Sequence, residues 1–263
     1  MEKSKLLDRV AGSAEERLFY ARILDKYEQA RTRNVPTATG FLSPQEQAMA
    51  EILLHTAGIG GVCFDGGYAE AERKRLRFAP TWMDEELLRE EADISCLCCR
   101  FYEGDTLSHR DFLGSILALG LTREKIGDIL VGTGEAHVLT DAAVLPFLLQ
   151  EYKSAGRTKL RVSEFPLAEL VLPEKKTRLL HDTVMSLRLD SICATGFSVS
   201  RSKAAELIQA GLAEVNYLPC RKGDRLLAEG DTVSARGYGK FTLESVGGTS
   251  RKGRVSITVR RFI

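Results

Sequence analysis

SRSKAAELIQAG (residues 200–211) has the features of a short helix with an unusual first turn. Ser200 is a favourable N-cap, apolar residues recur at helical spacing, and Gly211 is suited to end the helix. The first turn carries Arg201 and Lys203, although the positive end of a helix dipole favours acidic residues there. The sequence therefore predicts a helix start that concentrates positive charge and suits an anionic ligand.

The residues around this helix form a longer ordered pattern. RLDSICATGFSVSRSKAAELIQAGLAEVN (188–216) predicts a short helix, a turn at Gly196, the helix described above and a strand that ends at Asn216. GDTVSARGYGKF (230–241) follows. The order Arg-Leu-Asp, Ser-Arg-Ser-Lys-Ala, Gly-Leu-Ala-Glu-Val-Asn, Gly-Asp and Arg-Gly-x-Gly-Lys-Phe resembles the RNA-binding domain named after ribosomal small-subunit protein four, also called the alpha-L domain.

This resemblance implies an RNA-binding surface. Cations at the helix start and on the nearby strands and turns are expected to contact phosphates, which position a protein without reading sequence. Asn216 or Tyr217 is expected to touch a base or ribose, with Tyr217 offering a stacking face. Lys222 lies in NYLPCRKGD (216–224), which departs from the Pro-Ser of many related domains. The predicted RNA-binding residues are Arg188, Ser200, Arg201, Ser202, Lys203, Asn216, Tyr217, Lys222, Arg236 and Lys240.

The resemblance extends upstream. FDGGYAEAERKRLRF (64–78) and HRDFLGSILALGLTREKIGDILV (109–131) are similar, in that order, to recurring stretches of the bacterial YlmH family. The resemblance implies that the partners are ribosomal RNA and the large ribosomal subunit. We expect a non-enzymatic protein without cofactor or metal. The resemblance also implies contact with a stalled peptidyl-tRNA, in the ribosome-associated quality-control pathway that tails incomplete chains.

Composition is compatible with this expectation. The chain has 263 residues and a net charge of +1. From Thr183 to the end, 13 Lys and Arg oppose 7 Asp and Glu, a net +6, whereas 24 oppose 29 elsewhere, a net −5. Such segregation favours a nucleic-acid-binding module, although a solvated basic face gives the same count. The sequence shows neither a membrane span nor a signal peptide, and we expect a cytoplasmic protein without membrane partners.

The patterns predict an α+β chain in three parts: 1–83, 84–175 and 183–263. In the first, a mainly helical region, SAEE (13–16) and SPQE (43–46) have the form of capping boxes, and residues 65–80 are expected to form a charged helix. In the second, ISCLCCRF, HRDFLGSILALG, KIGDILV, AHVLT, DAAVLPFLLQEYKSAG and LRVSEFPL predict strand, helix, strand, strand, helix and strand. That order predicts a ferredoxin-like (split βαβ) domain, with the alpha-L domain as the third part.

The middle part offers a second candidate RNA contact. Arg110 opens the predicted helix at 109, and Arg123 and Lys125 precede a strand. They either contact RNA or form ordinary surface. In the second interpretation Asp111 interacts with the helix dipole and His109 is an exposed neighbour of the cap.

The alternative function is an RNA-modifying enzyme, either a pseudouridine synthase or a ribosomal RNA methyltransferase with an appended RNA-binding domain. RLDSICATG (188–196) shares Arg-Leu-Asp with pseudouridine synthases, but the Thr expected soon after lies at 195. We therefore interpret Asp190 as a helix cap that pairs with a cation. The glycines of DILVGTGEAHV (128–138) precede a second strand rather than a helix, so a hairpin is favoured over a nucleotide-binding turn.

Cysteine and histidine positions predict no metal site. Cys96 and Cys98 share one strand face and Cys99 points to the other, which favours buried, apolar thiols. The six cysteines show no disulfide or paired CxxC spacing. The four histidines lie in separate predicted elements without ligand spacing. No catalytic residue is expected.

Overall fold

The computed structural model describes residues 3–91, 93–172 and 176–263. The chain forms two compact units, Met1–Pro173 and Glu174–Ile263, each with its own buried apolar clusters. The three-part division at 1–83, 84–175 and 183–263 stays a prediction, and its boundary at residue 175 lies outside the described residues. Over those ranges, no helix is long and apolar enough to cross a membrane.

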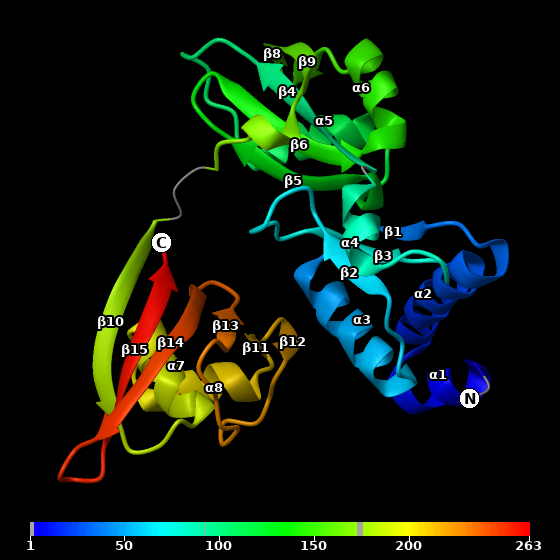
Figure 1. Ribbon diagram of the computed structural model, residues 1–263. Coiled ribbons are helices and arrows are strands. Elements are labelled where there is room, and N and C mark those ends of the chain that lie inside the picture. The colour runs from blue at the N-terminus through cyan, green and yellow to red at the C-terminus, as the bar shows by residue number, and fades with distance from the viewer. Residues whose placement is uncertain (1–2, 92, 173–175) are drawn as a thin grey trace. The chain divides into compact units, whose positions relative to one another are not determined.

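Helices and a small sheet form the beginning of the first unit (Figure 1). The sheet is antiparallel with the order β1-β3-β2, and apolar side chains such as Leu53, Leu76 and Phe78 are fully buried between it and the helices. The elements are α1 (Lys3–Val10), α2 (Ala14–Arg33), β1 (Thr37–Leu42), α3 (Pro44–Ala57), β2 (Val62–Asp65) and β3 (Lys74–Phe78). The predicted N-terminal helices are confirmed.

The two predicted capping boxes differ in detail. At α3, Ser43 and Glu46 form the reciprocal pair, as predicted, and Pro44 occupies the first turn. At α2, the Ser13 hydroxyl accepts from the Glu16 amide at 3.2 Å, but the Glu16 carboxylate accepts from the amide of Gly12 rather than from that of Ser13. Both helix starts are nevertheless capped.

The predicted charged helix over 65–80 is wrong. Gly67, with φ +88°, lies in the turn after β2, and residues 74–78 form the central strand β3. The side chains of β3 alternate between the two faces of the sheet. Leu76 and Phe78 enter the core on one face. Arg75 and Arg77 point to the other face and are only 8% and 2% exposed. Buried arginines with carboxylate partners look, in sequence, like the polar face of a helix.

The middle of the first unit has the ferredoxin-like arrangement that the sequence predicts (Figure 1). Its antiparallel sheet has the order β5-β6-β4-β9, and α5 and α6 pack on one face. The elements are β4 (Ile94–Arg100), α5 (His109–Ala118), β5 (Ile126–Val131), β6 (Glu135–Asp141), α6 (Leu145–Glu151) and β9 (Arg161–Phe165), with α4 (Glu85–Glu90) before them. The predicted β5–β6 hairpin is confirmed.

The second predicted helix of this region is shorter than expected. Its helical part ends at Glu151, and residues beyond it form a small hairpin of β7 (Ser154–Ala155) and β8 (Thr158–Lys159). Gly156, with φ +58°, lies in the turn of that hairpin. Gly156, which the sequence predicted to end the helix, therefore lies in the turn of a β-hairpin instead.

The cysteines of β4 follow the predicted alternation. Cys99 packs against the helices on one face, and Cys96 lies on the opposite face with Phe41 and Leu139. All six cysteines are buried free thiols. Burial raises the pKa of Cys96 to about 12, so this thiol is protonated at neutral pH.

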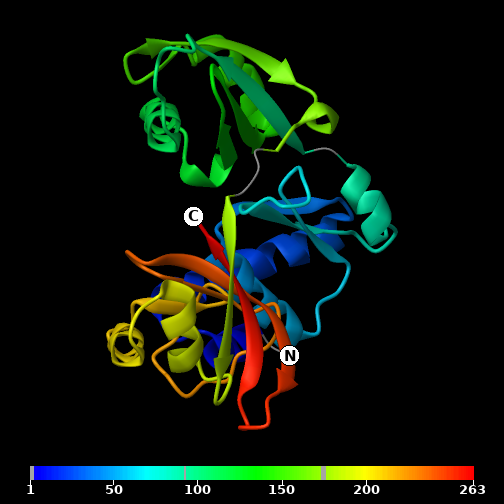
Figure 2. The same ribbon diagram turned by 90° about the vertical axis from the view of Figure 1, so that its left-hand side faces the viewer.

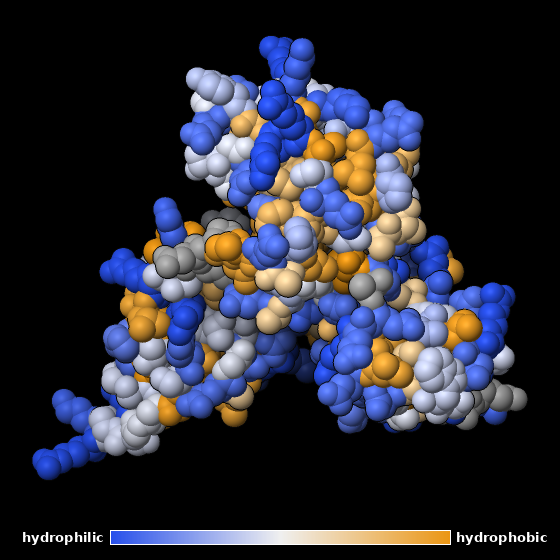
Figure 3. Space-filling model, turned by 45° about the horizontal axis from the view of Figure 1, so that its top comes forward, coloured by the Kyte–Doolittle hydropathy of each residue, from blue (hydrophilic) through white to orange (hydrophobic). Residues whose placement is uncertain are grey.

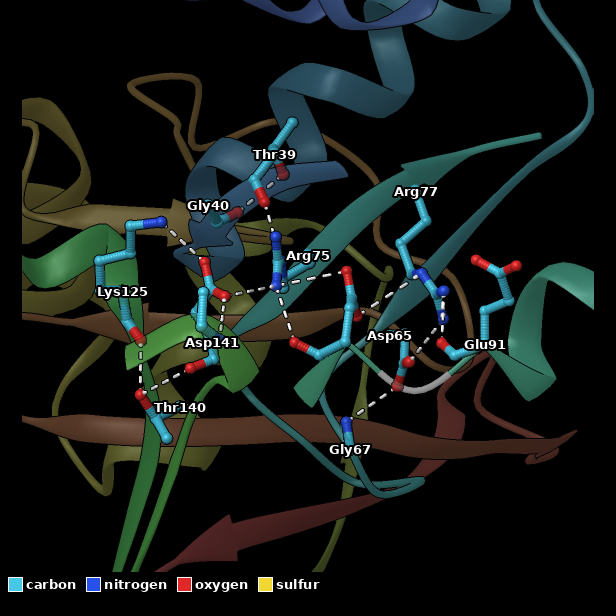
Figure 4. Close-up of polar contacts among 12 residues, drawn as sticks. Thr39, Gly40, Asp65, Gly67, Arg75, Arg77, Glu91, Lys125, Thr140 and Asp141 are labelled. Carbon is cyan, nitrogen blue, oxygen red and sulfur yellow. Dashed lines mark hydrogen bonds and ion pairs between the residues drawn. The ribbon is translucent and has the colours of Figure 1, made fainter. Parts of the chain in front are cut away.

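A polar network joins β3 to the ferredoxin-like sheet (Figure 4). Arg75 donates to the carbonyls of Thr39 and Asp93, each at 2.9 Å, and its Nη1 lies 3.6 Å from Asp141 of β6. The Lys125 ammonium binds the other oxygen of Asp141 at 2.7 Å. Because a buried guanidinium must keep its partners, this network favours one arrangement of the two sheets within the first unit.

The second unit combines two helices with a six-stranded antiparallel sheet (Figure 2). The strand order is β10-β15-β14-β13-β11-β12, and the long strands run beside the helices. The elements are β10 (Thr177–Val184), α7 (Leu189–Phe197), α8 (Arg201–Gln209), β11 (Ala213–Val215), β12 (Leu218–Pro219), β13 (Thr232–Ala235), β14 (Gly239–Thr249) and β15 (Val255–Phe262).

Two predicted turn positions are shifted. Gly196 lies inside α7 rather than in a turn, and the left-handed residue that separates α7 from α8 is Ser198, with φ +56°. The strand predicted to end at Asn216 ends at Val215. Asn216 and Tyr217, with φ +51° and +65°, form the two-residue turn of the β11–β12 hairpin, a conformation that Asn tolerates well.

Candidate nucleic-acid interface

The start of α8 presents hydrogen-bond donors and positive charge, as the sequence predicts. The Ser200 hydroxyl accepts from the Lys203 amide at 3.2 Å, which confirms Ser200 as the N-cap. The side chains of Arg201 and Lys203 are 59% and 48% exposed, and the first turn contains no acidic residue. Ser202 is exposed beside them, 3.0 Å from the Ser200 hydroxyl. These groups can converge on a phosphate.

Asp190 of α7 supplies the acidic partner that the first turn of α8 lacks. Its carboxylate accepts from Arg188 at 2.9 and 3.2 Å, and from Arg201 at 3.2 and 3.3 Å. Burial alone would raise the pKa of Asp190, but the hydrogen bonds from Arg188 and Arg201 outweigh it and lower the pKa. Two guanidinium groups therefore share one carboxylate, and the cluster keeps a net positive charge.

This arrangement corrects the predicted role of Asp190. The N-cap of α7 is Arg188, which makes no side-chain cap bond, and Asp190 is the second residue of the helix. Its predicted pairing with a cation is confirmed. Lys203 also has a partner, Glu206, at 3.1 Å. The cations of the helix start are thus paired yet largely exposed, and exposed pairs contribute little energy that a phosphate must overcome.

Replacing Asp190→Asn is expected to lower the free energy of unfolding of the second unit by about 1–2 kcal/mol at neutral pH, because two guanidinium groups lose a charged acceptor. The lowered pKa of Asp190 fixes the pH dependence. The carboxylate contributes its full stability above the unfolded-state pKa of about 3.9 and loses it as the pH falls through the lower folded-state pKa.

Hydrogen exchange of the α7 amides in the full chain, followed from neutral to acidic pH, measures this effect. The variant should be less protected than the wild-type chain at neutral pH, and the two should converge at the acidic end. An equal difference at every pH would show that the carboxylate charge is not responsible.

A second group of predicted residues lies around the β11–β12 turn. The Asn216 amide donates to Asp231 at 2.8 Å and its oxygen accepts from the Thr232 amide at 2.9 Å, so this side chain stabilises the turn. The Lys240 ammonium lies 6.0 Å from the centre of the Tyr217 ring and 5.0 Å from that of Phe262. A cation over an aromatic face is a stable local pair. Tyr217 is half-buried there.

Lys222 and Arg236 are exposed in two different turns. The Lys222 turn lies against the start of α7, because the Asp190 amide donates to the Gly223 carbonyl at 3.0 Å. Arg236 lies between β13 and β14, where its amide donates to the Leu212 carbonyl at 3.3 Å. The structure therefore brings Lys222 close to the Arg188–Asp190–Arg201 cluster through the backbone contact of its neighbour.

The three residues predicted to contact RNA in the middle region differ in whether their charged groups are free to bind a phosphate. Arg110 is exposed at the start of α5. Arg123 donates to the carbonyls of Ile126 and Gly127, and burial lowers its pKa to about 10. Lys125 is bound to Asp141. Arg123 and Lys125 therefore stabilise the start of β5 and the polar network, and we retain only Arg110 as a candidate RNA contact.

Sequence reasoning missed the basic residues of the β14–β15 hairpin. Arg251 and Lys252 are exposed at its end, which projects at the lower left of Figure 3 as a hydrophilic tip. Arg261 donates to the Ser198 hydroxyl at 3.3 Å, which places its guanidinium beside the α7–α8 turn. The clusters RKGR (251–254) and RR (260–261) are the sequence signal that indicates them.

Comparison with known proteins gives matches over most of the chain. Residues 15–82 match a model described as "YlmH, N-terminal", residues 100–169 one described as "Putative RNA-binding domain in YlmH", and residues 187–233 the S4 domain. Ribosome-associated protein quality control protein P2 of Bacillus subtilis (strain 168) is 32% identical over 226 residues, 85% of this chain and 86% of that protein.

A solved structure is also similar. "Cell division protein ylmH from Streptococcus pneumoniae" has a TM-score of 0.50 and 24% identity, and the match covers 60% of this chain and 96% of that chain. At this identity the likeness concerns the fold alone. The S4-domain match at 187–233 includes α7, α8 and the β11–β12 turn. Eight of the predicted residues lie within the match: Arg188, Ser200, Arg201, Ser202, Lys203, Asn216, Tyr217 and Lys222.

Proposed function

The chain belongs to the YlmH family, and from this premise we propose that it binds RNA of the large ribosomal subunit during quality control of stalled translation. Its domain matches give it an RNA-binding role. The observation that carries the finer proposal is the start of α8, where Arg201 and Lys203 are exposed beside the N-terminal amides of the helix within the S4 domain. A phosphate backbone is the ligand that fits this combination.

In the proposed binding step, Arg201 exchanges its present hydrogen-bond acceptor, the Asp190 carboxylate, for a phosphate of the RNA. Arg188 makes the shorter, two-pronged contact with Asp190, whereas Arg201 is more exposed and makes the longer contacts. An arriving phosphate binds Arg201 and Lys203 and the α8 amides, while Asp190 continues to hold Arg188. Tyr217 and Lys240 provide a second contact, in which the aromatic ring stacks on a base or ribose.

The relative from Bacillus subtilis is named a ribosome-associated quality control protein, which supports ribosomal RNA as the target of this chain and peptidyl-tRNA as a further contact. We propose that the chain acts in the cytoplasm by binding rather than by catalysis. Asp190, the residue that a pseudouridine synthase would use, is engaged by two arginines.

Salt dependence tests the proposed contacts. We expect the full chain to sediment with purified large subunits and not with small subunits. Three or four phosphate contacts predict that affinity falls roughly 20- to 100-fold between about 50 and 200 mM salt. Affinity that is insensitive to salt, or equal for both subunits, would contradict the proposal. Turnover in a methyl-transfer or uridine-isomerisation assay would contradict the binding-only mode.

A further inference from the structure

Three groups that can bind a metal lie on one face of the ferredoxin-like sheet in the first unit, whereas the start of α8 belongs to the second unit. Cys98 of β4 and His137 of β6 are direct cross-strand partners. Glu135 precedes His137 by two residues, so both side chains emerge on the same face of β6. One sulfur, one imidazole nitrogen and one carboxylate oxygen of these residues lie within 4.8 Å of one another.

A second observation points to a ligand at this position. His137 is 9% exposed, and its Nε2 has no hydrogen-bond partner. A buried nitrogen without a partner loses its hydration without compensation, which is an energetic penalty. The ring of Phe165 meets the imidazole edge to face, with ring centres 4.5 Å apart, and so fixes its position. A metal ion bound to Nε2 would remove the penalty.

The surroundings allow an ion to enter. A cavity of about 240 Å³ is lined by two of the three groups, Glu135 and His137, together with Phe165, Glu169, Val171 and others. Cys98 is 1% exposed, so its sulfur forms the buried side of the site. The cavity leaves room for a water molecule as a further ligand.

The electrostatics are compatible with metal binding. Burial lowers the pKa of His137, so the imidazole is neutral at pH 7 and its nitrogen can bind an ion. Burial raises the pKa of Cys98, although the charge of the nearby Arg100 opposes this rise. Zinc binds sulfur as the thiolate, so the Cys98 thiol releases its proton when the ion binds. Arg100 also lies 3.8 Å from Glu135, which it must share with the ion.

We propose that Cys98, Glu135 and His137 bind a zinc ion, with water as the fourth ligand. Zinc accepts sulfur, nitrogen and oxygen donors together in tetrahedral geometry, whereas calcium and magnesium prefer oxygen donors alone. Zinc–sulfur and zinc–nitrogen bonds of about 2.3 and 2.0 Å require the donors to approach slightly, by side-chain rotation. The ion would link β4 to β6 on the face of the sheet opposite α5 and α6.

The sequence predicted no metal site, because it compared only neighbouring cysteines and the spacing of histidines. The proposed ligands are distant in sequence and meet only through the strand register. This inference is independent of the proposed ribosomal function.

Metal titration of the reduced full chain, stripped with a chelator, tests the proposal. We expect one zinc per chain by elemental analysis, and a thiolate-to-metal charge-transfer band when cobalt(II) replaces zinc. Cys98→Ala and His137→Gln should each weaken zinc binding at least about 100-fold, since changes outside the ligand shell alone cost about 10- to 100-fold. Glu135→Gln, at a partly exposed position, should weaken binding without unfolding the chain.

The controls are Cys220→Ala and His181→Gln, which remove a buried thiol and an exposed imidazole from the second unit. Both should retain one zinc per chain. The proposal is overturned if the wild-type chain binds no stoichiometric zinc. It is also overturned if zinc binding is undiminished both in the Glu135→Gln variant and in one of the variants Cys98→Ala and His137→Gln. Circular dichroism of each variant identifies any loss that comes from unfolding, and Glu135→Gln decides the outcome in that case.

Discussion

Replacing Arg201 and Lys203 together with glutamate is expected to lower the affinity for large ribosomal subunits by at least about 100-fold at physiological salt. The change converts two attractive charges at the start of α8 into repulsive ones, where a phosphate would meet the helix amides. The fold should persist, because both side chains are largely exposed and Arg188 continues to hold the Asp190 carboxylate. Co-sedimentation measures the affinity.

A matched control separates a specific contact from overall charge. Arg31→Glu with Arg33→Glu makes the same change in net charge on exposed residues at the end of α2, in the first unit. We expect this variant to bind large subunits within about 3-fold of the wild-type chain, since exposed charges that do not contact the RNA are largely screened. Equal losses in the two variants would mean that net charge alone governs binding, and undiminished binding by the α8 variant would refute the proposed contact.

Local sequence patterns predicted the fold where local interactions determine it. The cap at Ser43, the β5–β6 hairpin and the strand-helix alternation of the middle region depend on residues a few positions apart, and the structure confirms them. The prediction of a helix in place of strand β3 was wrong because the arginines of β3 are buried against partners that are distant in the sequence. Asp93 and Asp141 supply the charges that make a central strand with Arg75 stable.

The same distinction applies to the candidate site. Ser200 as a cap follows from four consecutive residues, and the sequence predicted it correctly. The sharing of Asp190 between Arg188 and Arg201 depends on the packing of α7 against α8, which no spacing rule gives. Arg123 shows the converse. Its sequence position suggests a surface cation available to RNA, but its guanidinium donates hydrogen bonds to backbone carbonyls of β5. Charge counts locate a basic unit, and only tertiary contacts show which cations are available.

Replacing Gly196→Ala is expected to destabilise the second unit by about 2–3 kcal/mol, because the added methyl group overpacks the core. A Cβ at this position would lie 2.3 Å from Cδ1 of Phe241, whose ring is fully buried. The ring also meets Phe197 edge to face at 4.9 Å, so it has little room to move away. The sequence placed this glycine in a turn, but its function is to let α7 approach the sheet.

Gly114→Ala is the matched control, since Gly114 is an exposed residue within α5 whose Cβ would meet nothing within 4 Å. There alanine should stabilise the helix by about 0.5–1 kcal/mol. Hydrogen exchange of α7 and α5 in the two full-length variants measures both effects, and equal shifts in the same direction would contradict the packing argument. Because α7 carries Asp190, displacement of α7 from Phe241 should also weaken ribosome binding, although Gly196 itself contributes no side chain to RNA.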